Sequence, residues 1–154
     1  MTIHRPPRPP VTVQPGNLYG PGTSRRTPVG RMVWSALRSH PVVLDTDPEA
    51  PLHPLHVKDL VSALSAVLQD PSGAGGFTLA GEKPSTARDL AETVSRVVRP
   101  VPVELSPTPS ASPSTPLVPA LPPGWHPTVD LDYGLHSFAQ WLAYEAIHLP
   151  EADQ

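Results

Sequence analysis

The residues best placed for chemistry lie where a short β-branched run meets a glycine-rich turn. Residues 11–14 are typical of a strand, and Pro15 and Gly16 follow directly. Glycine permits a sharp turn at the carboxyl end of a strand, which is where ligands sit in open α/β sheets. Asn17 comes next, and by its residue type alone we interpret it as a residue that tolerates a left-handed turn conformation.

Two histidines, His53 and His56, are close enough in sequence to suggest a metal pair. No third ligand lies nearby, so we expect no metal site. We interpret His56 as a core histidine and Asp59 as a helix-start residue that offsets the positive end of a helix. The absence of cysteine excludes disulfides, thiolate chemistry and thiolate zinc sites.

The elements that must position these residues alternate between strand and helix. Apolar spacing predicts helices over residues 28–39, 58–68, 86–98 and 130–148, the third capped by Ser85. The second helix shows one apolar stripe: Leu60, Val61, Leu64, Val67 and Leu68. Short strands are expected at residues 11–14, 42–44, 77–79 and 101–105, and a further apolar run covers residues 52–57. The pattern predicts an α/β fold with a few short strands, about four helices and an incomplete sheet.

Composition sets the remaining limits. Of the 154 residues, 24 are proline, against a usual share of about one in twenty. Residues 1–10 form a proline-rich tail, and residues 106–123 form a Pro/Ser-rich linker that we expect to make few contacts. A net charge of −3 gives no field for nucleic acid, and no apolar run is long enough to cross a membrane. Without a secretory leader, a cytoplasmic location is expected.

Four segments, taken in order, resemble a known family. Residues 11–22 (VTVQPGNLYGPG) are similar to a strand with an R-P-G-N-x-Y-G-P loop, and residues 55–60 (LHVKDL) to V-H-V-D-D-L. Residues 76–90 (GFTLAGEKPSTARDL) are similar to F-N-x-G-x-G-E…S-x-x-E-L. The closing G-W-x-P…E-E-G-L…W pattern resembles Gly124 to Pro127, Asp132 to Leu135 and Trp141. The family is that of the extended short-chain dehydrogenases/reductases, the NAD-dependent sugar-nucleotide epimerases and dehydratases.

The resemblance implies an incomplete Rossmann-type fragment, the C-terminal, substrate-side portion of such an enzyme. Residues 11–105 would form the substrate-side α/β lobe, and residues 124–154 a C-terminal helix segment. By the same resemblance, Pro15 and Gly16 line the nicotinamide side of an NAD(P) cofactor. Asn17 and Tyr19 would bind substrate, Asn17 through a hydrogen bond to a nucleotide-sugar. For Asn17 the turn and ligand interpretations both stay open.

The chain departs from the family at the residues that carry its chemistry. No glycine-rich fingerprint follows a strand, and none of the three tyrosines has a lysine four positions on, so no catalytic residue is assigned. Gln14 stands where the loop motif has arginine. Leu52 stands where an arginine normally pairs with the diphosphate, and leucine cannot supply that charged fork. We therefore expect the chain alone to bind no NAD(P), and the loss of this arginine argues against nucleotide-sugar binding.

These departures leave three functional hypotheses. The first is a truncated epimerase/dehydratase-like protein without activity in isolation. The second is a non-catalytic binding or partner module that completes or regulates a separate Rossmann half. The third, an independent enzyme with another site, has the least support, because function must be argued from sites and the family's sites are missing. In the first two cases an uncovered sheet face would favour self-association or docking.

Overall fold

The computed structural model describes residues 11–69, 75–108 and 116–148, so the tail expected over residues 1–10 lies outside the described chain. Helices alternate with short strands, most of them in parallel pairs. This confirms the predicted α/β class with four helices and a fragmentary sheet. The predicted helices all form, with bounds that differ from the expected ones by at most two residues.

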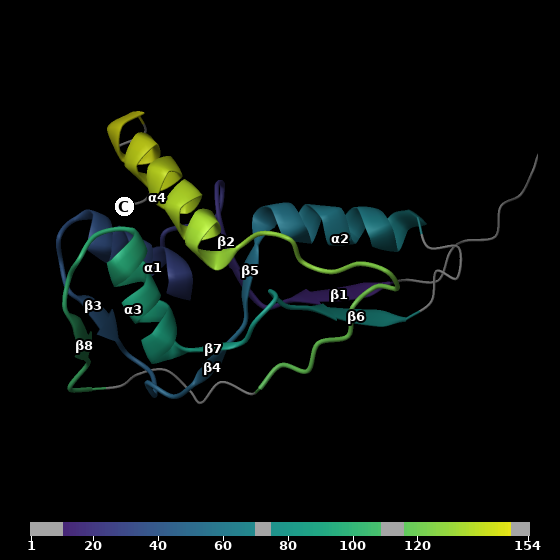
Figure 1. The fold of residues 1–154 in the computed structure, drawn as a ribbon, viewed down its shortest axis with the longest axis horizontal. Helices are drawn as coiled ribbons and strands as arrows, with labels where there is room; N and C mark the ends of the chain where they lie inside the picture. The colour runs from purple at the N-terminus through teal and green to yellow at the C-terminus, as the bar shows by residue number, and fades with distance from the viewer. Residues whose placement is uncertain (1–10, 70–74, 109–115, 149–154) are drawn as a thin grey trace, which may run out of the picture.

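Three helices and one strand pair form the larger hydrophobic core. α1 (Pro28–Leu37) and α3 (Ala87–Val97) pack on β3 (Val42–Leu44), which pairs in parallel with β8 (Val103–Leu105), and α4 (Leu131–His148) packs against α1 and α3 (Figure 1). The side chains at the centre of this core are almost fully buried: Tyr19, Val29, Val33, Val42, Leu90, Val94, Leu135, Phe138 and Leu142.

The remaining helix covers a second and much smaller hydrophobic cluster. α2 (Val57–Gln69) runs along the pair formed by β1 (Thr12–Pro15) and β6 (Gly76–Leu79), which are parallel (Figure 1). The fully buried members of this cluster are Leu55, Ala63 and Leu79. Because so few side chains are enclosed, this part of the chain contributes much less hydrophobic stabilisation than the larger core.

Two further strand pairs join these regions. β2 (Asn17–Tyr19) runs parallel to β5 (Pro54–His56), and β4 (Pro51–Leu52) runs antiparallel to β7 (Ser85–Thr86). The apolar run expected over residues 52–57 is thus divided between two pairings. β2 and β7 were not predicted, because Asn17 was interpreted as a turn residue and Ser85 and Thr86 as the start of a helix.

Threonine hydroxyls cap the first turns of α1 and α3, and the cap of α3 differs from the predicted residue. Thr27 precedes Pro28, and its hydroxyl accepts a hydrogen bond from the Gly30 amide at 3.1 Å. At α3 the cap is Thr86, whose hydroxyl accepts from the Asp89 amide at 3.0 Å. The prediction of Ser85 as this cap was wrong, because the helix begins at Ala87, one residue later than expected, and the cap position therefore falls on Thr86.

The structure describes the two ends of the linker expected over residues 106–123. In the second of them Ala120 pairs with Thr78 of β6 through two backbone hydrogen bonds, 2.8 and 2.9 Å long. This bridge occupies the edge of β6 that faces away from β1. The extent of the linker and its few contacts stay a prediction, because residues 109–115 lie outside the described chain.

A buried carboxylate fastens the segment before α4 to the start of α2. Asp59 is only 2% exposed. One of its oxygens accepts from the amide and hydroxyl of Thr128 at 3.0 and 3.1 Å, and the other accepts from the Val129 amide at 3.0 Å. Asp59 does lie in the first turn of its helix, as expected, but its main partners are about 70 residues away.

Asp59→Asn should destabilise the protein because an amide nitrogen would then face a backbone N–H donor. We expect a loss of about 2–3 kcal/mol in the free energy of unfolding, measured by chemical denaturation. Asp89→Asn is the matched control: Asp89 is also acidic and in the first turn of a helix, but it is exposed. Its loss should stay below about 0.5 kcal/mol. Equal losses in the two variants would contradict the role given to Asp59.

Candidate functional site

The turn between β1 and β2 is held firmly by the backbone. The Gly16 amide donates to the Leu79 carbonyl at 2.8 Å, and the Asn17 amide donates to the His53 carbonyl at 2.8 Å. The Asn17 side-chain oxygen in turn accepts from the His53 amide at 2.8 Å. The residues that the sequence singled out therefore sit in a fixed segment that joins the two regions of the fold.

Packing explains why position 16 is glycine. A Cβ atom there would overlap the carbonyl oxygen of His53. The Gly16 N–H is already used by Leu79, so it is not a ready donor for an anionic group. Pro15 is exposed beside it. Their placement on the nicotinamide side of a cofactor stays a prediction.

Asn17 is not a turn residue. Among the described non-glycine residues only Ser39 has a positive φ, and Asn17 lies in β2. The left-handed interpretation was therefore wrong. Because the Asn17 oxygen is bonded to His53, its amide nitrogen is the group that remains to donate to a ligand. The ligand-binding interpretation is compatible with this geometry and remains a prediction.

Tyr19 lies in different surroundings from Asn17. It is 2% exposed, with its ring edge-on to His56 at 5.2 Å and to Phe138 at 6.4 Å. It borders a small cavity of about 110 Å³, whereas Asn17 borders a separate one. Burial, with smaller effects of the Asp59 and Asp130 carboxylates, raises the pKa of the Tyr19 hydroxyl. Tyr19 therefore stays a neutral phenol, and the structure does not bring the two predicted substrate residues into one cavity.

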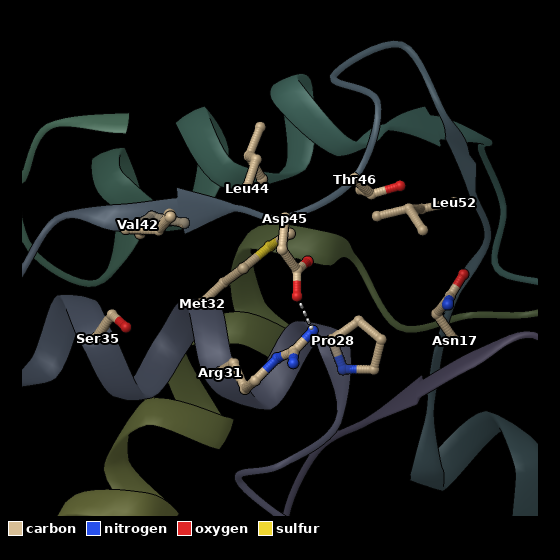
Figure 2. A pocket seen from close by; sticks show the side chains of 11 residues that line it. Asn17, Pro28, Arg31, Met32, Ser35, Val42, Leu44, Asp45, Thr46 and Leu52 are labelled. Carbon is tan, nitrogen blue, oxygen red and sulfur yellow. Dashed lines mark ion pairs between the residues drawn. The ribbon is translucent and has the colours of Figure 1, made fainter. Parts of the chain in front are cut away.

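The cavity beside Asn17 has a volume of about 420 Å³ and lies between α1 and β3 (Figure 2). Arg31 of α1 and Asp45, directly after β3, form an ion pair of 3.3 Å across it. Sequence reasoning missed both residues. A polar residue that directly follows a strand, as Asp45 does, is the signal that would have pointed here. The lining residues are Asn17, Pro28, Arg31, Met32, Ser35, Val42, Val43, Leu44, Asp45, Thr46 and Leu52.

His56 is held by the start of α2 rather than by a ligand. Its Nδ1 atom accepts from the Lys58 amide at 3.1 Å, so the side chain acts as a helix cap, and its Nε2 atom is buried without a hydrogen-bond partner. Within the described residues no group of three possible metal ligands comes together. In the same part of the chain, no helix has both the length and the apolar character needed to cross a membrane.

The outer side of α2 and the adjacent edge of β1 are left uncovered by the residues that the structure describes, and we call this surface the docking face. The side chains of Val61 and Leu64 are 66% and 39% exposed, while Ala63 lies in the small cluster and Val67 is buried as well. The single stripe predicted for this helix is thus divided into an inner and an outer face. In the described chain β1 pairs only with β6, so its second edge carries unpaired backbone groups.

Gly16→Ala should reduce stability because the new methyl group overlaps the His53 carbonyl, a backbone atom that cannot rotate away. We expect a loss of about 1–3 kcal/mol in urea denaturation. Gly76→Ala is the control, since the nearest atom to a Cβ there, the Thr12 carbonyl oxygen, is 3.9 Å away. A neutral Gly16→Ala variant would show that the segment adjusts freely.

His56 should make the protein less stable in mild acid. Burial lowers the pKa of the His56 imidazole below its usual 6.5; Asp59 opposes this shift and Lys58 adds to it. The unfolded chain therefore takes up a proton near pH 6.5 that the folded chain resists, so stability falls as the pH drops below 6.5. His56→Asn keeps a cap acceptor and should flatten this dependence in melts at pH 7.5 and 5.5. His126→Asn, at an exposed position, should not.

Comparisons with known proteins identify the fold. No family model and no curated protein matches the chain. Among solved structures, an epimerase from Methanothermobacter thermautotrophicus matches with a TM-score of 0.78 at 17% identity, over 91% of this chain and 45% of that one. UDP-glucose 4-epimerase from Thermotoga maritima, solved with UDP-glucose, matches with a TM-score of 0.72 at 19% identity, over 87% of this chain and 46% of that one.

A third match is the UDP-glucose 4-epimerase of Thermus thermophilus, solved with NAD, with a TM-score of 0.71 at 20% identity. It covers 86% of this chain and 46% of the epimerase. The chain thus spans slightly less than half the length of the structures it resembles. Its fold is the Rossmann-like α/β arrangement of one part of a UDP-sugar 4-epimerase chain.

Proposed function

We propose that these 154 residues form a substrate-side lobe of the NAD-dependent epimerase/dehydratase type, without catalytic activity in isolation. In this proposal the lobe works by docking on a cofactor-binding Rossmann half that the chain does not contain. The observation that carries the proposal is the docking face, the open edge of β1 together with the outer side of α2. The match to slightly less than half of each epimerase chain is in keeping with it.

The exposure of β1 is unusual for a parallel strand. Thr12, Gln14 and Pro15 are exposed, and only Val13 is half-buried. Parallel sheets are normally covered on both faces and flanked by further strands. Since Ala120 already occupies the far edge of β6, another strand can extend this sheet only beside β1.

The outer side of α2 fits the same partner. A parallel strand added to a sheet brings a crossover helix that lies in the layer of the neighbouring helices. A strand beside β1 would therefore place its helix near α2, against Val61 and Leu64. A helix that is apolar on two sides is normally enclosed on both. One Rossmann half can thus cover the strand edge and the helix together.

The described residues do not fit a complete cofactor site. The Gly16 amide is bonded to Leu79, and no glycine-rich loop at a helix start is present in the sequence to hold a pyrophosphate. Nor does the buried Tyr19 offer an ionisable hydroxyl near neutral pH, because its pKa is raised. We therefore assign NAD binding and proton transfer to the partner half.

Val61→Lys should disrupt docking because it places an ammonium group in the apolar contact, which must then be desolvated. The chain is co-expressed with a protein of its own genome that carries the glycine-rich fingerprint and the Tyr-x-x-x-Lys pair. We expect wild type and Ile147→Lys to co-elute with this partner and Val61→Lys to bind it at least about tenfold more weakly, or about 1.4 kcal/mol. Ile147 is a matched control, since it is 75% exposed on α4.

The isolated chain provides the second part of the test. It should give no calorimetric signal with NAD, and it should self-associate or bind 8-anilinonaphthalene-1-sulfonate in a manner that Val61→Lys reduces. A monomer with a sharp melt and no dye binding, or a micromolar constant for NAD, would overturn the proposal. Self-association without docking would favour the second candidate, a homo-oligomer formed through the same open edge.

A further inference from the structure

The cavity between α1 and β3 has the size and the lining of a small-molecule site. Its volume of about 420 Å³ falls in the usual range of about 300–1,000 Å³ for such sites. Its walls include four buried apolar side chains: Met32, Val42, Leu44 and Leu52. The cavity belongs to the larger core and is distinct from the docking face.

The charged groups of the cavity neutralise one another. Arg31 is the single cationic residue of the lining, and its guanidinium is 3.3 Å from the Asp45 carboxylate (Figure 2). The two side chains are 56% and 35% exposed, so the pair lies on the solvent side of the cavity, over the apolar walls. An anionic ligand that bound Arg31 would leave Asp45 without its counter-charge and beside a second negative group.

The remaining polar groups suit an uncharged ligand. Asn17 has its amide nitrogen left to donate, and the hydroxyl groups of Ser35 and Thr46 also border the space. A few polar groups among apolar walls fix the orientation of a ligand, while the apolar surface supplies most of the affinity. Leu52 adds to the apolar wall at the side where Asn17 lies (Figure 2).

We propose that this cavity binds an uncharged, largely apolar small molecule and discriminates against phosphorylated ones. The observations that support this assignment are the neutralised Arg31, the buried apolar walls and the single free amide of Asn17. The assignment goes beyond the docking function and does not depend on it, because no residue of the cavity lies on α2 or β1.

The test uses N-phenyl-1-naphthylamine, a neutral fluorescent probe, with the full chain. We expect a saturable component of one probe per chain at micromolar concentration, with a blue-shifted emission, in addition to the dye binding expected at the docking face. Ser35→Phe fills the cavity from a half-exposed helix position and should weaken binding at least tenfold, while Ser35→Ala leaves the space open and should keep it. Thermal melts of both variants show whether the fold is intact.

Two further arms separate this proposal from its alternatives. Val61→Lys alters the docking face and should reduce only the dye binding that this face contributes, leaving the saturable component unchanged. If Val61→Lys abolished that component while Ser35→Phe kept it, the probe would bind at α2 and the assignment would be overturned. Uridine 5′-diphosphate should not displace the probe at millimolar concentration. Displacement at micromolar concentration, or no saturable probe binding to wild type, would equally overturn it.

Discussion

The arrangement of the two regions of the fold depends on the hydrogen bonds of the buried Asp59 carboxylate. Asp59 is buried at the start of α2, yet its three donors come from Thr128 and Val129 just before α4. α4 supplies the larger core with Leu135, Phe138 and Leu142. A buried charge is tolerated only when such donors surround it. This one interaction therefore fixes the entry of the last helix and ties the two regions together.

The sequence predicted the elements of the fold much better than their connections. Apolar spacing identified all four helices, because each must bury a continuous face. Apolar spacing does not predict hydrogen bonds between residues that are far apart in the sequence. Examples are the bond between Asn17 and His53 and the bond between Asp59 and Thr128. It also could not divide the stripe of α2 between an inner and an outer face, since spacing shows that Val61 is apolar but not what covers it.

The site was predicted unevenly for a related reason. Asn17 was singled out, and it does line a cavity, but its conformation is that of a strand and not of a turn. Tyr19, two residues on, is turned into the core against His56 and Phe138. Arg31 and Asp45 form their ion pair because α1 packs on β3. This tertiary contact cannot be predicted from the local sequence around either residue.

Proline accounts for the short strands and so for the open construction of the sheet. Pro15 ends β1, and Pro51 and Pro54 begin β4 and β5. Because proline has no N–H to donate, it is confined to strand ends and edges and interrupts a continuous ladder. The described strands therefore form pairs instead of one sheet. In the part of the chain that the structure describes, α2 is the one helix that packs along the β1–β6 pair.

The docking face and the cavity are joined by a segment that has little freedom to move. β1 leads through Gly16 directly into Asn17, and this junction is held by hydrogen bonds to Leu79 on one side and His53 on the other. A partner that pairs with β1 would thus be placed at a fixed distance from the wall of the cavity. Pairing and ligand binding use different side chains, but the same rigid turn sets the position of both. A change at Gly16 that loosened it would disturb the two sites together, whereas changes at Val61 or Ser35 would each affect only one.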